Sequence, residues 1–147
     1  MLASLDCPAF KIAAIDVERQ RLWRMVEATG KPVVASFRDL GHLYRVPFRP
    51  VPIPPAAMLF CPPSYPQTSF GFRGVFQQDD YHTGFDGFSY HGTDFQVPAY
   101  AVAAGARIIE CHVMLYEAPS ELESNVSLTD RQLIAAIREI RKVEGLL

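Results

Sequence analysis

The sequence lacks the features that mark membrane, secreted and nucleic-acid-binding proteins. No run of about 18 apolar residues is present, so we predict no membrane-spanning helix. The start has no basic segment followed by a long apolar run, so we expect no signal peptide. The charge is balanced, with 14 Lys and Arg against 16 Asp and Glu. We therefore expect neither a nucleic acid nor a membrane as a partner.

Cysteine is also scarce, and its distribution points to a compartment. The three cysteines, Cys7, Cys61 and Cys111, are far apart and lack metal-type spacing. An odd number of separated cysteines indicates free thiols in a reducing compartment, so we expect a cytoplasmic protein. The 147 residues, 49% hydrophobic and 20% charged, predict one soluble domain over residues 1–147.

The most informative stretch runs from Gly87 to His112. Its pattern predicts a strand, a loop, an alanine-rich helix and a second strand. Side chains alternate across a strand, so Ser89 and His91 share one face, as do Glu110 and His112. A crossover helix makes the two strands parallel, and the carboxyl ends of parallel strands carry the chemistry of α/β folds. The stretch therefore predicts two histidines at the same end of the sheet.

These motifs resemble those of the sialic acid synthase family. That family carries "G-[FY]-S-D-H-T", "A-A-V-A-x-G-A" and "[VI]-I-E-K-H". The chain reads G-F-S-Y-H-G at 87–92, A-V-A-A-G-A at 101–106 and I-E-C-H at 109–112. The resemblance implies condensation of phosphoenolpyruvate with an N-acetylated sugar such as N-acetylmannosamine. It also implies that His91 and His112 hold a divalent metal, Mn²⁺ or Mg²⁺, which places the two side chains within about 6 Å.

The resemblance implies four further site residues. The segment around Lys11 is similar to the family's "[AF]-F-K-I-A-S-G-D", and Lys11 with Ser89 would bind phosphoenolpyruvate. Glu110 and Glu123 would be the catalytic carboxylates that orient the sugar or move protons, with Glu123 standing where the family has Asp.

Three departures weaken the expected activity. Ala14 replaces a family Ser, Pro63 a polar residue and Tyr90 an Asp. We therefore expect a synthase-like protein that is impaired or inactive as a lone chain. The alternative is a non-catalytic structural or assembly module descended from the same family.

The fold class follows from the strand signals and the resemblance. The family's catalytic domain is a (β/α)8 barrel, and this chain resembles its last part. We predict an α/β fold, a partial TIM-type barrel with about five parallel strands at 10–14, 32–36, 57–61, 87–89 and 107–111. The first and last of these would be open edges, which predicts a homo-oligomer or a subunit of a larger complex.

The remaining segments predict helices and one irregular stretch. A helix is expected over 17–29, and another begins at a capping signal on Ser127 or Thr129. Its apolar stripe comprises Leu133, Ile137, Ile140 and Val143. Residues 37–56, which contain five prolines, predict an extended surface segment. That segment is either a recruitment motif for a proline-binding module or a divergent loop. Two or three helical turns remain open at 72–78.

Overall fold

Strands and helices alternate along the computed structural model, which describes residues 6–45, 55–68, 71–73, 75–76, 84–119 and 121–147. The strands are β1 (Phe10–Ile12), β2 (Val33–Phe37), β3 (Ala57–Phe60), β4 (Gly87–Tyr90), β5 (Ile108–Met114) and β6 (Ser127–Thr129). The helices are α1 (Gln20–Glu27), α2 (Leu40–Arg45), α3 (Val97–Ala103) and α4 (Asp130–Glu144). Within the described residues, no helix is long and apolar enough to cross a membrane.

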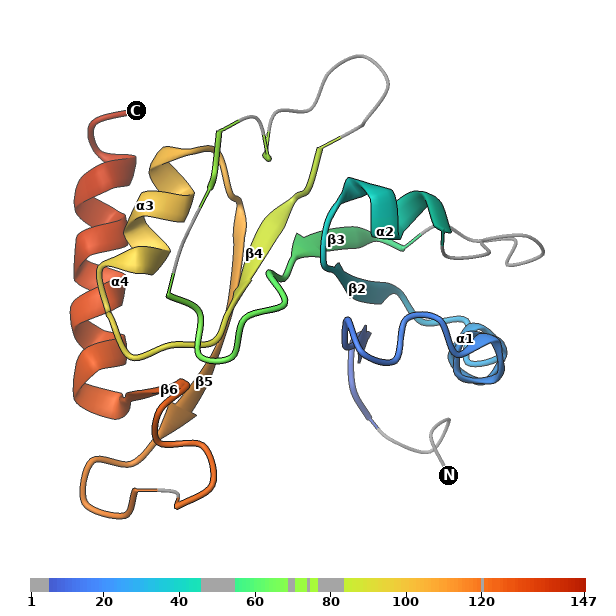
Figure 1. Ribbon diagram of the computed structural model, residues 1–147, viewed down its shortest axis with the longest axis horizontal. Coiled ribbons are helices and arrows are strands. Elements are labelled where there is room, and N and C mark those ends of the chain that lie inside the picture. The colour runs from blue at the N-terminus through green and yellow to red at the C-terminus, as the bar shows by residue number, and fades with distance from the viewer. Residues whose placement is uncertain (1–5, 46–54, 69–70, 74, 77–83, 120) are drawn as a thin grey trace.

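The six strands form one curved parallel sheet in the order β1-β2-β3-β4-β5-β6 (Figure 1). A contact between β1 and β5 shows its curvature, since Lys11 Nζ lies 2.7 Å from Glu110 Oε2. In a flat sheet, four strand spacings would hold these strands roughly 19 Å apart, beyond the reach of the two side chains. The sheet is therefore half of a barrel, as predicted, with a concave inner face and a convex outer face.

The structure has one more strand than predicted. β6 pairs with β5 from His112↔Ser127 to Met114↔Thr129, and β5 itself runs on to Met114. The prediction of an open edge at 107–111 is therefore wrong, because β6 covers that strand. A three-residue strand gives no periodic pattern in the sequence, which is why Ser127 looked like a helix cap.

The irregular segments differ in part from expectation. α2 occupies Leu40–Arg45, so the start of the predicted extended segment is helical. Its length of 6 residues fits before the first proline of the segment, Pro47. Residues 46–54, with most of those prolines, lie outside the described residues. In the described part of 72–78, Val75 N donates to Phe72 O at 3.1 Å, which makes a single turn.

The core lies on the convex face, between the sheet and the helices. It contains alternate strand residues, such as Ile12, Phe37 and Phe88, packed with Trp23 of α1 and Ala136 of α4. In Figure 1, α3 and α4 lie side by side outside β4 and β5. This packing turns the remaining alternate residues to the concave face.

α4 begins at a capping box. Thr129 Oγ1 accepts a hydrogen bond from Gln132 N, and Gln132 Oε1 accepts one from Thr129 N at 2.9 Å. The alternative cap, Ser127, lies in β6.

The predicted apolar stripe of α4 is wrong at Ile137, which is 47% exposed. The helix packs on α3 through the small residue Ala136, which is 1% exposed.

Candidate functional site

The two predicted histidines meet at the carboxyl end of the sheet. His91 follows β4 directly, and His112 lies within β5, one residue after the paired residues Tyr90 and Cys111. The ring centroids are 5.0 Å apart, which confirms the predicted proximity. The prediction that His112 ends its strand is wrong, since β5 continues for two residues to Met114.

Lys11 and Glu110 form an ion pair across the concave face. Lys11 Nζ lies 2.9 Å from Glu110 Oε1 and 2.7 Å from Oε2. Burial favours the neutral form of Glu110, but the hydrogen bonds from Lys11 and Ser89 outweigh it, so the pKa of this carboxyl is lowered. At neutral pH the site therefore holds a carboxylate whose charge is already matched by an ammonium group.

His112 is oriented by Glu123, which comes from the loop between β5 and β6. The Nδ1 atom of His112 lies 2.9 Å from Glu123 Oε2. An ionised carboxylate only accepts hydrogen bonds, so Nδ1 carries a proton, and in the neutral imidazole the lone pair is then on Nε2. Carboxylate partners hold metal-binding histidines in this way.

His91 is held by a different kind of partner, Gln67. Gln67 N donates to His91 O at 2.7 Å, and Gln67 Oε1 accepts from His91 N at 3.1 Å. Gln67 Nε2 and Cys61 Sγ lie 3.3 Å and 3.8 Å from His91 Nδ1. Burial, followed by the nearby His112, lowers the pKa of His91, and burial raises the pKa of the Cys61 thiol. His91 is therefore a neutral imidazole beside a protonated thiol at pH 7.

Two buried serines lie on the concave face, Ser89 on β4, two residues before His91, and Ser36 on β2. Ser89, predicted as a substrate ligand, is 2% exposed and hydrogen-bonds to Glu110. Ser36 of β2 is 1% exposed, and its Oγ finds no hydrogen-bond partner among the described residues. A buried hydroxyl without a partner costs about 1–3 kcal/mol, so Ser36 has an unmet capacity for one hydrogen bond. The sequence analysis did not select Ser36. Its position at the end of a predicted strand that neighbours the strand of Lys11 could have indicated a site residue.

Tyr65 is a second site residue that the sequence analysis missed. Its ring centroid lies 5.0 Å from that of His91 and 6.4 Å from that of His112. The side chain is 57% exposed, so it covers the histidine pair from the solvent side. No local pattern distinguishes this tyrosine from the other aromatic residues of the chain.

The residues present fit a divalent cation through two imidazoles. Within the described residues, no group of three or more His, Cys, Asp or Glu side chains could hold a metal ion. The protein would thus supply His91 and His112, and oxygen atoms of substrate or water would fill the other positions. The spacing of the rings and the hydrogen bond between His112 Nδ1 and Glu123 suit this arrangement.

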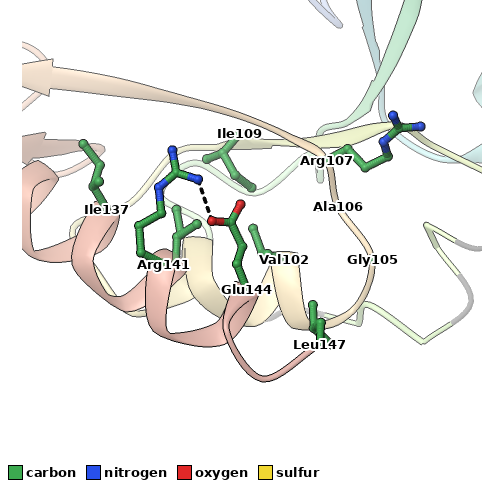
Figure 2. A pocket seen from close by; sticks show the side chains of 10 residues that line it. Val102, Gly105, Ala106, Arg107, Ile109, Ile137, Arg141, Glu144 and Leu147 are labelled. Carbon is green, nitrogen blue, oxygen red and sulfur yellow. Dashed lines mark hydrogen bonds and ion pairs between the residues drawn. The ribbon is translucent and has the colours of Figure 1, made fainter.

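A separate groove lies at the opposite end of β5. This groove of about 570 Å³ runs between α3, α4 and the residues that precede β5, and Figure 2 shows Arg141 paired with Glu144 at its side. Arg107 and Ile109 also line it. The groove is at the amino end of β5, away from the histidines, where barrel folds do not keep their chemistry.

Comparisons with known proteins agree on one family. The NeuB family model matches residues 57–147. Two pseudaminic acid synthases, from Campylobacter jejuni subsp. jejuni serotype O:2 (strain ATCC 700819 / NCTC 11168) and serotype O:23/36 (strain 81-176), are each 27% identical over 153 residues. Each alignment covers 99% of this chain and 44% of the relative. The chain thus spans less than half the length of the curated relatives it matches.

A solved structure shares the fold. It is the crystal structure of N-acetylneuraminic acid (sialic acid) synthetase from Leptospira borgpetersenii serovar Hardjo-bovis in complex with citrate. The TM-score is 0.81 at 21% identity, over 96% of this chain and 51% of that chain.

Proposed function

The chain belongs to the NeuB family, and from this membership we propose that its concave face binds the reactants of a sialic acid synthase-type condensation. In that reaction C3 of phosphoenolpyruvate forms a carbon–carbon bond with the aldehyde carbon of an N-acetylated sugar, water adds at C2, and inorganic phosphate leaves. The observation that carries the proposal is the pair of imidazole rings, 5.0 Å apart at the carboxyl end of neighbouring parallel strands. Two histidines brought together from separate strands are a typical metal-binding arrangement.

His91 and His112 would hold a divalent metal, Mn²⁺ or Mg²⁺. When bound, such a metal acts as a Lewis acid that polarises the sugar's aldehyde oxygen. Glu123 accepts the Nδ1 proton of His112 and so turns Nε2 toward the ligand position. We therefore assign Glu123 as a positioning residue for His112, in place of the predicted role of orienting the sugar or moving protons.

An anion subsite for phosphoenolpyruvate would lie below the metal position. Lys11 supplies the positive charge, while Ser89 and the unpartnered Ser36 supply hydroxyl donors. Glu110 now neutralises Lys11, so an incoming phosphate or carboxylate would compete with this carboxylate for the ammonium group. Glu110 is then released beside the reacting groups, where a carboxylate can accept or return a proton.

The lone chain should turn over poorly. Within the described residues, the concave face is walled by six strands of one half-barrel and open on the other side. An open site leaves water around the reacting groups, which weakens electrostatic stabilisation of the transition state. We therefore expect binding of metal and phosphoenolpyruvate without efficient condensation.

A Mn²⁺ titration of the full chain followed by calorimetry tests this proposal. Wild type should bind one ion, and His91→Asn with His112→Asn together should abolish binding. Unchanged binding in the double variant would overturn the metal site. An assay with phosphoenolpyruvate, Mn²⁺ and N-acetylmannosamine should give no product above background, and clear turnover would contradict the expected impairment.

A second candidate function, an assembly module, is favoured by the open sheet. Among the described residues, β1 and β6 each pair on one side only. Large apolar side chains near these edges are exposed, among them Ile15 at 73%, Leu115 at 62% and Tyr116 at 55%. Open edges and apolar patches of this kind attract partners. We propose a homo-oligomer, or a subunit of a larger complex, joined at these edges.

Light scattering of the purified chain tests the assembly proposal. A mass at least twice the 16.4 kDa of the chain is expected at micromolar concentration. Leu115→Lys should shift the distribution toward monomer. Leu122→Lys should not, because Leu122 is 92% exposed in the loop between β5 and β6. A stable wild-type monomer would show that the edges need no partner.

A further inference from the structure

Gln67 hydrogen-bonds to His91 through both its backbone and its side chain, although neither motif nor composition pointed to it. The residue is 5% exposed and follows Tyr65 and Pro66 in the loop after β3. Its backbone N donates to His91 O at 2.7 Å, and its side-chain Oε1 accepts from His91 N at 3.1 Å. These two bonds fix the amide against the backbone of His91.

The orientation of the Gln67 amide follows from its partners. The backbone N–H of His91 can only donate, so it must face Oε1. On the other side, Nε2 faces two carbonyl oxygens, which can only accept: Ser89 O at 3.1 Å and Pro62 O at 3.4 Å. A flipped amide would set two donors against each other on one side and acceptors on the other. Nε2 therefore lies on the side of His91 Nδ1, 3.3 Å away, and its two hydrogens face three neighbours, the two carbonyl oxygens and Nδ1.

From this geometry we infer that Gln67 is a positioning residue that keeps the proton of His91 on Nε2. A proton on Nδ1 would face the Nε2 amino group, which has no lone pair to accept it, whereas the Nδ1 lone pair faces that amino group and the weak donor of the Cys61 thiol 3.8 Å away. His112 has the opposite tautomer, because the Glu123 carboxylate accepts its Nδ1 proton. The two histidines are thus unequal in their neutral forms. His91 presents an Nε2–H to the site, and His112 presents the lone pair of its Nε2 atom.

The consequence for the metal rests on the proposed function. A cation that binds Nε2 of both rings meets a ready ligand in His112 but must displace the proton of His91. That proton would move to Nδ1, where it would face the hydrogens of the Gln67 amide. His91 is therefore the weaker ligand in this chain, and an acceptor in place of Gln67 Nε2 should strengthen it.

The tautomers are measured directly by long-range proton–nitrogen NMR on the ¹⁵N-labelled, metal-free wild-type chain. His91 is expected as the Nε2–H form and His112, the internal control, as the Nδ1–H form. His91→Asn and His112→Asn assign the signals. An Nδ1–H form of His91 in wild type would overturn the inference, whatever the chain does with metals.

Two substitutions of Gln67 then test the cause. Gln67→Met keeps the shape without the amide donor and should lose the preference for Nε2–H. Gln67→Glu offers a carboxylate and should move the proton to Nδ1 and tighten Mn²⁺ binding about 10–100-fold, the usual range for partners of metal-binding histidines. Unchanged tautomers in a folded Gln67→Met chain would overturn the role of Gln67.

Mn²⁺ titrations of the same variants distinguish a failure of this inference from a failure of the proposed function. Thr68→Val, at the exposed neighbour, should leave both the tautomers and Mn²⁺ affinity unchanged. Absence of Mn²⁺ binding in wild type and in Gln67→Glu would overturn the proposed function and leave the tautomer result standing. Equal, measurable Mn²⁺ affinity in the two chains would overturn the claim that Gln67 weakens His91 as a ligand.

Discussion

The convex and concave faces of the sheet use alternate residues of the same strands but opposite chemistry. The convex side buries Ile12, Phe37 and Phe88 against the helices. The concave side presents Lys11 and Glu110, together with serines and histidines, near the carboxyl ends of the strands. The comparison shows that stability resides on one face and the candidate chemistry on the other, so substitutions one residue apart should have different effects.

Tyr90 illustrates this division. It stands where the related family has Asp, but its side chain lies on the convex face, 2% exposed, and its hydroxyl accepts a hydrogen bond from Asp94 N at 2.9 Å. The departure therefore changes the core rather than the concave site. Sequence comparison counted it as a lost polar site residue, because the alternation of faces was not applied to it.

The largest effect is expected for Phe88→Ala on the convex face. Phe88 is 0% exposed, and its ring lies 4.9 Å from Phe72 and 5.9 Å from Tyr90 between centroids. Removing the ring leaves a cavity and should lower the free energy of unfolding by about 3–5 kcal/mol. Urea denaturation measures this loss. Ser89→Ala, one residue along on the concave face, is the control, with an expected loss of about 1 kcal/mol; equal losses would break the comparison.

A second test asks whether the concave face tolerates added volume at its base. A Cβ at Gly87 would lie 2.2 Å from Ile108 O and 2.7 Å from Ile108 Cβ, in the neighbouring strand. Backbone atoms cannot move aside easily, so Gly87→Ala should destabilise the chain by about 1–3 kcal/mol. Gly71→Ala, where nothing lies within 4 Å, should show no comparable loss in the same denaturation experiment.

The third prediction concerns the concave face alone and rests on the proposed metal site. Glu123→Gln replaces the acceptor at His112 Nδ1 and should weaken Mn²⁺ binding about 10–100-fold. Stability should change little, since Glu123 is half exposed. Calorimetric titration compares it with Glu121→Gln in the same loop. If both variants bind Mn²⁺ like wild type, Glu123 does not orient a metal ligand.

The smallest effect is expected from the Lys11–Glu110 pair. The pKa of Glu110 is lowered in the folded chain, so its stabilising contribution is present above the usual carboxyl pKa. It is lost as pH falls through the lowered folded-state value. Lys11→Met should reduce the loss of unfolding free energy on acidification by less than about 1 kcal/mol, because both side chains of the pair are about one-third exposed. Lys142→Met, which removes an exposed pair with Glu139 on α4, should leave that loss unchanged in the same pH series.

The sequence by itself determined much of the fold. Strand positions, the parallel crossover and the cap at Thr129 follow from periodicity and local hydrogen bonding, which act over a few residues. The pairing of His91 with His112 was also predictable, because two short strands joined by one helix leave little freedom in their spacing.

Tertiary structure alone decided how the site is held together. Gln67 reaches His91 from the β3 loop and Lys11 reaches Glu110 across the sheet, contacts that no local pattern encodes. The strand β6 exists only because β5 offers it a ladder of hydrogen bonds. The physical reason is that sequence patterns report which face a residue takes, whereas sheet curvature and loop paths decide which distant residues share that face.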